Sequence, residues 1–412
     1  MKLPAVSWRL AIVACGLVIL SSGCSSISPD LLKNIGINTG VGGVEALLKR
    51  PSFSEADEAK IAEENAGKFE AQAKMWSDPL LEAYITDIGQ HLVAVAKPRP
   101  FPYRFRIIAD PGVNAFTFGG GLVYVNAGLL ARMDNEAQVA MVLAHEIGHV
   151  TESHVPKGIE AQYGIQVLGQ LAAAAASTSG VLPPYALGKS YEYTMNAAIN
   201  GHGRGRESEA DEVGLDYMVK AGYDPREAPR TFEQLLKEYG DQSAVQNFFY
   251  GNHPTNVSRI ETTTRLVKEK YAADLGTRRL IVNTQEFNRR TRALVIATAK
   301  SDYDARRFKT ASVLYEKAVR IDSTDPVPHY YLGKIALDTG SGADALNRAI
   351  TELSQATTMN SQYAVAYRDL GLAYYRKGDR SNAATALERY LALEPAATDA
   401  AQINAALTDL KR

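Results

Sequence analysis

The chain has 412 residues, which is more than one ordinary hydrophobic core accommodates and predicts two or three domains. Apolar residues make up 46% of it and charged residues 22%, a composition typical of globular proteins. Lys and Arg (45) nearly balance Asp and Glu (46), so the basic excess of a nucleic-acid-binding protein and the acidic tail of a solvating segment are both absent. We therefore expect no nucleic-acid partner.

The first 23 residues have the layout of an export signal. Two basic residues precede an apolar run from Leu10 to Leu20, and a short stretch of small residues follows. The run is too short to span a bilayer comfortably. Residues 1–23 are therefore set aside when the fold is predicted.

The stretch LSSGC, which ends at Cys24, resembles the signal of bacterial lipoproteins. The resemblance implies that Cys24 is lipidated and becomes the mature N-terminus, and Ser25 after it implies the outer membrane as destination. Ser21 departs from the pattern, which usually has Leu there. IVAC, ending at Cys15, fits better locally but leaves only a stub of apolar segment. The alternatives are a signal cleaved without lipid, giving a soluble periplasmic protein, and an uncleaved anchor.

Both cysteines of the chain lie in this N-terminal segment. An exported protein without disulfides in its domains relies on its core or on a metal for stability. Residues 24–52 are rich in Ser, Gly and Asn and are predicted to be a flexible tether. Ser54 can then cap a helix, because Asp57 stands three positions later, close to a capping box. The helical pattern runs to about Val95, where a group of prolines ends it.

After these prolines the spacing of the apolar residues changes from a helical to an alternating pattern. Residues 103–110 (YRFRIIAD) and 121–128 (GLVYVNAG) alternate and are β-rich, so a small sheet with a Gly-rich bend is expected. Helical patterns follow over 129–154 and over about 206–222. The run between them, 164–186, is apolar and Ala-rich. We favour a buried helix there over a membrane-touching lid, because the run is too short to span a bilayer.

Two of the seven histidines stand four residues apart in the stretch VLAHEIGHV. Positions four apart share a helical face, so His145 and His149 can direct two imidazoles at one metal ion. Glu146 sits one step round the helix, where its carboxylate can take a proton from a water on that ion. This is the logic of the HExxH zinc metallopeptidases. A pair of ordinary hydrogen-bonded histidines is the alternative.

A catalytic zinc site needs a third protein ligand, and two candidates follow the motif. His154 comes five residues after His149, but a continuing helix would turn it away, so we expect it behind a ligand or against a backbone carbonyl. Glu207 is the better candidate, because it shares a helical face with Asp211, which can accept the outer N–H of a ligand histidine. Glu209 is expected to point into solvent. From these residues alone, an exposed charged helix is the simpler interpretation.

HEIGH, followed further along by RGRESEAD, resembles the gluzincin metallopeptidases related to HtpX and the type I CaaX prenyl protease. The resemblance implies one Zn²⁺ per chain, held by His145, His149 and Glu207. It implies that Glu146 is the general base of peptide-bond hydrolysis.

The same resemblance assigns roles to two further segments. VNAFTFGGGLVYVNAGLL is similar to the family's strand beside the cleft, which implies that Asn114, Ala115 and Phe116 pair with an extended substrate. A plain turn between strands is the alternative. NHPTNVSRI resembles the exported members, which implies that His253 closes the zinc site as a regulatory fourth ligand and that Arg259 orients the carboxylates. A plain loop histidine is the alternative.

After about residue 290 the chain becomes a string of helical pairs. AYRDLGLAYYRKGDRSNAATALERYLALEP resembles the tetratricopeptide repeat, a helix-turn-helix unit of ~34 residues. The pair Leu370-Gly371 recurs at Leu332-Gly333, and TGSGADALN accommodates a few extra residues between them. A weaker unit covers roughly 292–325, and residues 402–411 form a cap. Such units stack to bury their faces, so we expect a short solenoid with a concave groove for a protein partner. A generic helical bundle is the alternative.

The sequence thus predicts a mainly α protein. A zincin-like helical metallopeptidase domain with a small β-sheet is followed by an α-solenoid of tetratricopeptide repeats. The predicted segments are a lipoprotein-type signal peptide (1–23), a flexible tether (24–52), the zinc metallopeptidase domain (53–265), a connecting helix (266–291) and the repeat domain (292–412).

An exported HExxH domain followed by such repeats resembles the BepA-type proteases over roughly 53–412. The resemblance implies a zinc endopeptidase at the periplasmic face of the bacterial outer membrane, which degrades misfolded or stalled envelope proteins. It implies that the repeats bind unfolded substrate or the outer-membrane assembly machinery, and that Cys24 is the only membrane contact.

Two other classes of function were compared with this one. The first is a non-catalytic chaperone or assembly adaptor with a capped or structural zinc site. Glu146 argues against it, because a structural zinc site has no use for a base. The second is a membrane-embedded protease, which is disfavoured because no apolar run of the needed length follows the signal.

Overall fold

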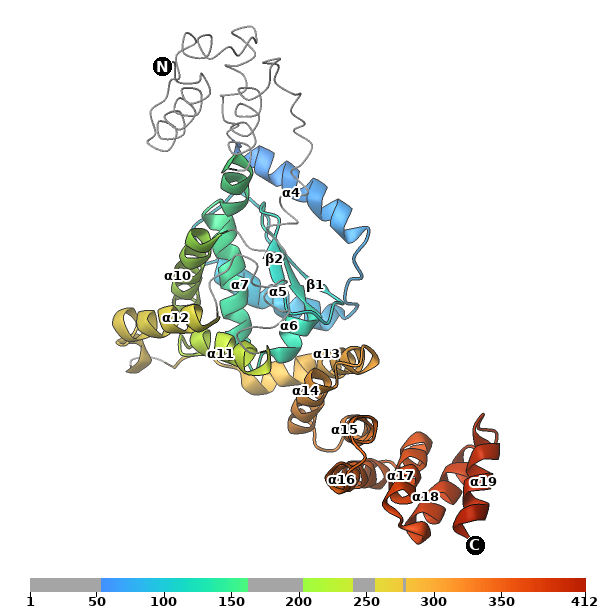
Figure 1. The fold of residues 1–412 in the computed structure, drawn as a ribbon. Coiled ribbons are helices and arrows are strands. Elements are labelled where there is room, and N and C mark those ends of the chain that lie inside the picture. Colours follow the sequence, from blue (N-terminus) through green and yellow to red (C-terminus); the bar gives the residue numbers. More distant parts are fainter. Residues whose placement is uncertain (1–52, 162–202, 240–255, 277–278) are drawn as a thin grey trace, which may run out of the picture.

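The computed structural model describes residues 53–161, 203–239, 256–276 and 279–412 (Figure 1). The expected signal, tether and Ala-rich run, together with His253, lie outside the described residues. Among those that are described, no helix is both long and apolar enough to cross a bilayer. The structure is mainly helical, with one small sheet in its N-terminal part and a row of helical pairs in its C-terminal part, which confirms the predicted fold class.

Helix α4 (Glu55–Glu70) begins at the predicted capping box. The backbone N–H of Asp57 donates to Ser54 Oγ (3.2 Å), and the N–H of Ser54 donates to the Asp57 carboxylate (3.0 Å). The helical pattern predicted for this region is divided in two. Helix α5 (Pro79–Val93) starts afresh with Asp78 as its N-cap and a proline in its first turn.

The sheet has three strands rather than the two that alternate visibly in the sequence. They are β1 (Arg104–Ile108), β2 (Ala115–Thr117) and β3 (Leu122–Asn126), in the order β1-β3-β2. β1 runs parallel to β3, and β2 runs antiparallel to it as an edge strand. Gly119, Gly120 and Gly121 all have positive φ in the bend before β3, a conformation that glycine adopts without strain.

Helices cover both faces of the sheet. On one face, Phe69 from α4 meets the rings of Phe116 (5.3 Å between centroids) and Tyr124 (5.4 Å) edge-on. On the other face, α5 and the histidine-bearing helix α7 (Glu136–Thr151) share a core with Ala115 and Val125. The sheet therefore forms a wall behind α7, and α7 lies in the centre of the N-terminal part (Figure 1).

Helices α6 (Ala127–Arg132) and α7 (Glu136–Thr151) also contact strands of this sheet. Helices α10 (Arg204–Lys220) and α11 (Glu227–Tyr239) pack against α7, and α12 (Asn256–Lys270) packs against α10 and α11. All 16 residues of α7 are buried, including its polar ones. Because solvent reaches none of these polar side chains freely, each of them requires partners within the fold.

The C-terminal part consists of three helical pairs and a final helix. They are α13 (Thr284–Asp304) with α14 (Phe308–Ile321), α15 (Pro326–Thr339) with α16 (Ala343–Met359), α17 (Ala364–Lys377) with α18 (Arg380–Leu393), and then α19 (Ala400–Leu410). Gly333 and Gly371 occupy the same place in two successive pairs. A Cβ on Gly333 would lie 2.6 Å from Leu353 Cγ, and one on Gly371 would lie 2.6 Å from Leu387 Cγ. The repeated Leu-Gly pattern thus marks a point where the two helices of a pair pack closely.

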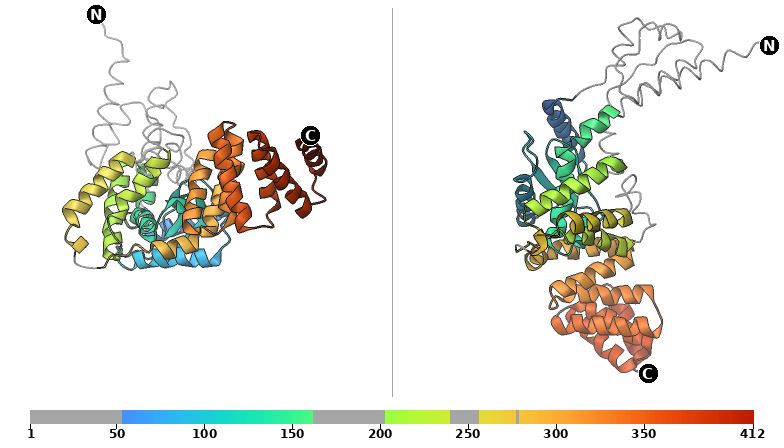
Figure 2. Two further views of the ribbon diagram at one scale, coloured as in Figure 1. Left: turned by 90° about the horizontal axis from the view of Figure 1, so that it is seen from below. Right: turned by 90° about the vertical axis from the view of Figure 1, so that its left-hand side faces the viewer.

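No single helix connects the two parts of the chain, although one was predicted over 266–291. Helix α12 ends at Lys270, and α13 begins at Thr284. The core that surrounds α7 continues into α13 and α14 through Phe287, Leu294 and Leu314. The first helical pair therefore packs as part of the N-terminal core, and the later pairs extend away from it (Figures 1 and 2).

Buried charged side chains connect the first helical pair to the N-terminal part of the structure. The guanidinium of Arg132 on α6 pairs with Glu238 on α11 (2.8 Å) and with Asp302 on α13 (3.1 Å), and all three side chains are almost fully buried. Lys317 on α14 donates to the carbonyl oxygen of Ala131 (2.8 Å). Because an unpaired buried charge is costly, these pairs bind the position of α13 to that of α6 and α11.

Candidate metal centre

Helix α7 presents the two motif histidines on one face. His145 Nε2 and His149 Nε2 lie 3.0 Å apart, and the rings are nearly perpendicular, at 84°. Both side chains are buried. This follows from their spacing of four residues on a straight helix.

Helix α10 brings a carboxylate to the same point. Glu207 Oε2 lies 3.2 Å from His145 Nε2 and 3.6 Å from His149 Nε2. One ligand atom from each of the three residues lies within 4.8 Å of the others, and all three residues are buried. Two imidazole nitrogens and one carboxylate oxygen, converging so closely, fit the donor set of a catalytic zinc ion.

Small residues allow α10 to lie this close to α7. A Cβ on Gly148 would lie 3.2 Å from the carbonyl oxygen of Ala210, so these two helices touch at backbone level. A Cβ on Gly214 would lie 2.8 Å from the backbone nitrogen of His145. The small side chain of Ala210 permits this close approach. Gly214 was not singled out in the sequence, although its spacing of four from Ala210 was a visible signal.

A carboxylate and an arginine lie behind His145. Its Nδ1 is 2.9 Å from Asp211 Oδ1, so the imidazole N–H on Nδ1 donates to Asp211 while Nε2 faces Glu207. Arg259 on α12 donates to both oxygens of Asp211, from Nη2 and from Nε (2.9 Å). The guanidinium carbon of Arg259 also lies 4.1 Å from the centre of the Phe232 ring on α11, a contact that the sequence did not signal.

His154 lies directly behind His149. The two Nδ1 atoms are 2.7 Å apart, and His154 Nε2 is 3.1 Å from Glu209 Oε2. His154 thus contacts a candidate ligand histidine, which is one of the two arrangements expected for it. The Glu209 side chain is 49% exposed, as expected, and one of its oxygens also faces His154.

Glu146 lies at the edge of a small, mostly apolar cavity. The residues lining this cavity are Leu129, Met141, Val142, His145, Glu146, Thr231, Phe232, Leu235 and Arg259. Glu146 itself is 5% exposed. Its carboxylate is thus separated from bulk water but adjacent to an apolar space beside the histidine pair.

The electrostatics of the site follow from burial and from the carboxylates. Burial raises the pKa of Glu146 to about 7; the His145 charge opposes this shift and Glu207 adds to it. Burial and Arg259 disfavour protonation of His145, but Asp211 and Glu207 outweigh them and raise the pKa of His145 to about 9. Burial lowers the pKa of His149 to about 3, so this imidazole is neutral at physiological pH.

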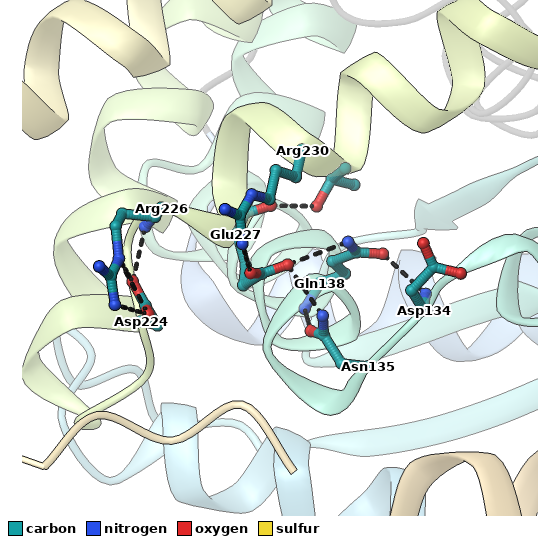
Figure 3. A network of polar contacts seen from close by, with 8 residues as sticks. Asp134, Asn135, Gln138, Asp224, Arg226, Glu227 and Arg230 are labelled. Carbon is teal, nitrogen blue, oxygen red and sulfur yellow. Dashed lines mark hydrogen bonds and ion pairs between the residues drawn. The ribbon is translucent and has the colours of Figure 1, made fainter. Parts of the chain in front are cut away.

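The N-terminal end of α7 is fixed by a separate polar network (Figure 3). Asn135 caps the helix by accepting from the N–H of Gln138 (3.0 Å). The side-chain amides of Asn135 (2.8 Å) and Gln138 (3.0 Å) both donate to Glu227 at the start of α11. The histidine-bearing helix is therefore attached to α11 at one end and packed against α10 along its length.

The strand expected to receive substrate is β2. Asn114 precedes it, and Ala115 and Phe116 belong to it. The N–H of Asn126 donates to the carbonyl oxygen of Asn114 (2.9 Å), so the alternation of an antiparallel ladder directs the N–H and C=O of Ala115 to the open side of the sheet. All three residues are buried as side chains. The expected fourth ligand, His253, lies outside the described residues.

Comparisons with known proteins agree with this geometry. Residues 79–267 match the family described as Peptidase family M48. Over 390 residues the chain is 26% identical to the beta-barrel assembly-enhancing protease of Escherichia coli (strain K12), which covers 88% of this chain and 77% of that protein. It is 27% identical over 271 residues to Metalloprotease LoiP of the same organism, covering 65% of this chain and 98% of that one.

Among solved structures, the first TPR of Spaghetti (RPAP3) bound to an HSP90 peptide aligns with 29% of this chain and 96% of that chain. The identity is 19% and the TM-score is 0.27. The helical pairs seen in the structure itself remain the basis for the repeat architecture.

Proposed function

Because residues 79–267 match Peptidase family M48, we propose that this chain is a zinc-dependent endopeptidase of the bacterial cell envelope. The observation that carries the proposal is the convergence of His145, His149 and Glu207, with Glu146 beside them. In this proposal the first three residues hold one Zn²⁺. Asp211 and His154 contact the two histidines on the side away from the metal, and Arg259 holds Asp211.

The residues of the site divide the chemistry between them. A zinc ion, when bound, acidifies a water molecule and polarises the peptide carbonyl. Glu146 takes the proton from the attacking water and gives it to the departing amine nitrogen. A carboxyl group whose pKa is raised to about 7 suits both roles near neutral pH. Asp211 holds the N–H of His145 throughout, so that Nε2 keeps its lone pair for the metal.

Substrate binds in this proposal as an added strand along β2. The register of β2 against β3 supports this proposal. Ala115, which stands between Asn114 and Phe116, directs its backbone N–H and C=O away from β3, where a substrate strand can pair with them. An unfolded segment can offer such backbone groups, whereas a folded domain has already paired them. Unfolded or misassembled envelope proteins are therefore the proposed substrates.

The remaining parts of the proposal rest on the sequence and on the similar proteins. Lipid on Cys24 holds the enzyme at the periplasmic face of the outer membrane, or the protein is soluble in the periplasm if the lipid is absent. The helical repeats bind substrate or the outer-membrane assembly machinery. His253 acts as a fourth ligand that keeps the enzyme latent until it is displaced.

The test compares soluble forms that start after Cys24. The wild type is expected to bind about one zinc and to cleave casein. Glu207→Gln is expected to lose both zinc and cleavage. The matched control, Glu212→Gln, alters an exposed carboxylate on the same helix and is expected to behave like the wild type. His253→Ala is expected to cleave faster.

Two results contradict the proposal in different ways. If the wild type binds zinc but neither it nor His253→Ala cleaves casein, the chain is a chaperone or assembly adaptor with a non-catalytic zinc site. If the wild type takes up no zinc, both the zinc endopeptidase and the adaptor with a zinc site are ruled out.

A further inference from the structure

The two histidines of the metal centre are supported in different ways. His145 donates to the buried carboxylate of Asp211, which Arg259 neutralises. His149 differs. Its Nδ1 faces Nδ1 of His154 at 2.7 Å, where Nδ1 of His145 faces a carboxylate at 2.9 Å. The other nitrogen of His154 faces Glu209 at 3.1 Å. A chain of contacts thus runs from His149 through His154 to Glu209.

The local backbone explains why His154 can reach this place. Helix α7 ends at Thr151, and Ser153 has a positive φ of 55°. This left-handed residue interrupts the helix before His154, and His154 faces His149. His154 is fully buried at 0% exposure, whereas the Glu209 side chain is 49% exposed. The chain of contacts therefore begins at the protein surface and ends at the metal centre.

The positions of the protons along this chain follow from what each group can do. The carboxylate of Glu209 only accepts, so His154 carries its proton on Nε2 and donates it to Glu209. The Nδ1 of a neutral His154 is then an acceptor, and the facing Nδ1 of His149 must carry the donated proton. A neutral His149 with its proton on Nδ1 has its lone pair on Nε2, the atom that faces Glu207.

We propose that His154 and Glu209 are positioning residues, which together fix His149 in the tautomer and orientation that bind the metal through Nε2. This inference rests on the proposed zinc site. Asp211 orients His145 by a direct contact. In this proposal the half-exposed Glu209 orients His149 through His154. Partners of this kind change metal affinity by roughly 10- to 100-fold when they are removed.

The test measures zinc affinity by competition with a chelating dye, in the soluble form that starts after Cys24. His154→Leu removes the acceptor behind His149, and Glu209→Ala removes the outer acceptor without disturbing the core. We expect zinc binding to weaken about 10- to 100-fold in the first variant and about 10-fold in the second. Glu212→Ala, an exposed change on the same helix, is expected to leave the affinity unchanged.

A conservative substitution separates positioning from a merely structural role. Glu209→Gln keeps an oxygen that accepts from His154 Nε2 but removes the charge, so it is expected to retain zinc affinity within about threefold of the wild type. Wild-type affinity in both His154→Leu and Glu209→Ala would overturn the inference, as would a Glu209→Gln variant as weak as Glu209→Ala. The proposed function is tested separately, by zinc uptake and casein cleavage of the wild type.

Discussion

Removal of the Arg132 guanidinium tests whether the repeats and the peptidase part share one core. Arg132 pairs with Glu238 (2.8 Å) and Asp302 (3.1 Å) and donates to the carbonyl oxygen of Gly128 (2.8 Å). In Arg132→Met, Asp302 keeps its pair with Arg307 (2.7 Å), so the loss falls mainly on Glu238. Breaking a buried ion pair by removing one partner costs about 3–5 kcal/mol, and the retained pair places this case near 3 kcal/mol.

The assay is urea unfolding of the soluble form, followed by two probes. Trp76 is the only tryptophan outside the signal segment, so its fluorescence reports on the peptidase part. Far-UV circular dichroism reports on all the helices. We expect Arg132→Met to lower the free energy of unfolding by about 3 kcal/mol in the transition seen by Trp76.

Two further variants make the test specific. Adding Glu238→Met to Arg132→Met is expected to restore most of the lost stability, because the buried Glu238 charge is then removed together with its partner, while Asp302 keeps Arg307. Arg289→Met removes a solvent-exposed partner of Glu286 and is expected to leave the unfolding midpoint unchanged. A change of less than about 1 kcal/mol for Arg132→Met would refute the reasoning that this buried pair holds the first helical pair to the N-terminal part.

Two other predictions follow from contacts in the same region. Gly214→Ala would place a Cβ 2.8 Å from the backbone nitrogen of His145, so it should push α10 away from α7. We expect zinc affinity, measured by dye competition, to fall at least about tenfold. Wild-type zinc affinity in this variant would contradict the prediction. Burial lowers the pKa of Lys317 to about 8, below its unfolded value, so the unfolded chain binds more protons and stability should rise with pH across that window. Relative to Lys317→Met, the wild type should gain about 2 kcal/mol between pH 7.5 and 9.5, whereas a constant difference would contradict the buried, charged lysine.

Local signals in the sequence predict the elements that depend on local chemistry. The capping box at Ser54 and Asp57 sets the start of α4, and the spacing of His145 and His149 places both imidazoles on one face of α7. The Leu-Gly pattern marks where paired helices touch. The first two features depend on residues within a turn or two of each other, so local patterns are enough to find them. The third is found because the Leu-Gly pair recurs along the chain.

Features that depend on distant residues were missed or needed the family resemblance. Glu207 looks like part of an exposed charged helix until α10 is known to lie against α7. Glu209 is exposed, as expected, but nothing in the sequence shows that one of its oxygens meets His154, which follows the left-handed Ser153. The three-residue strand β2 is too short to show alternation. The buried ion pairs of Arg132 join residues far apart in the chain, so no local pattern signals that the first helical pair packs into the N-terminal core.

The most direct measurement is the rate at which zinc-loaded Glu146→Gln cleaves casein, compared with the zinc-loaded wild type. The account predicts that the variant keeps about one zinc but cleaves at least about 100-fold more slowly, because the buried carboxylate beside the histidines moves the protons of the reaction. Glu152→Gln, a surface change at the end of the same helix, should cleave at the wild-type rate. If Glu146→Gln retains zinc and cleaves within about threefold of the wild type, Glu146 is not the general base and the proposed mechanism is wrong.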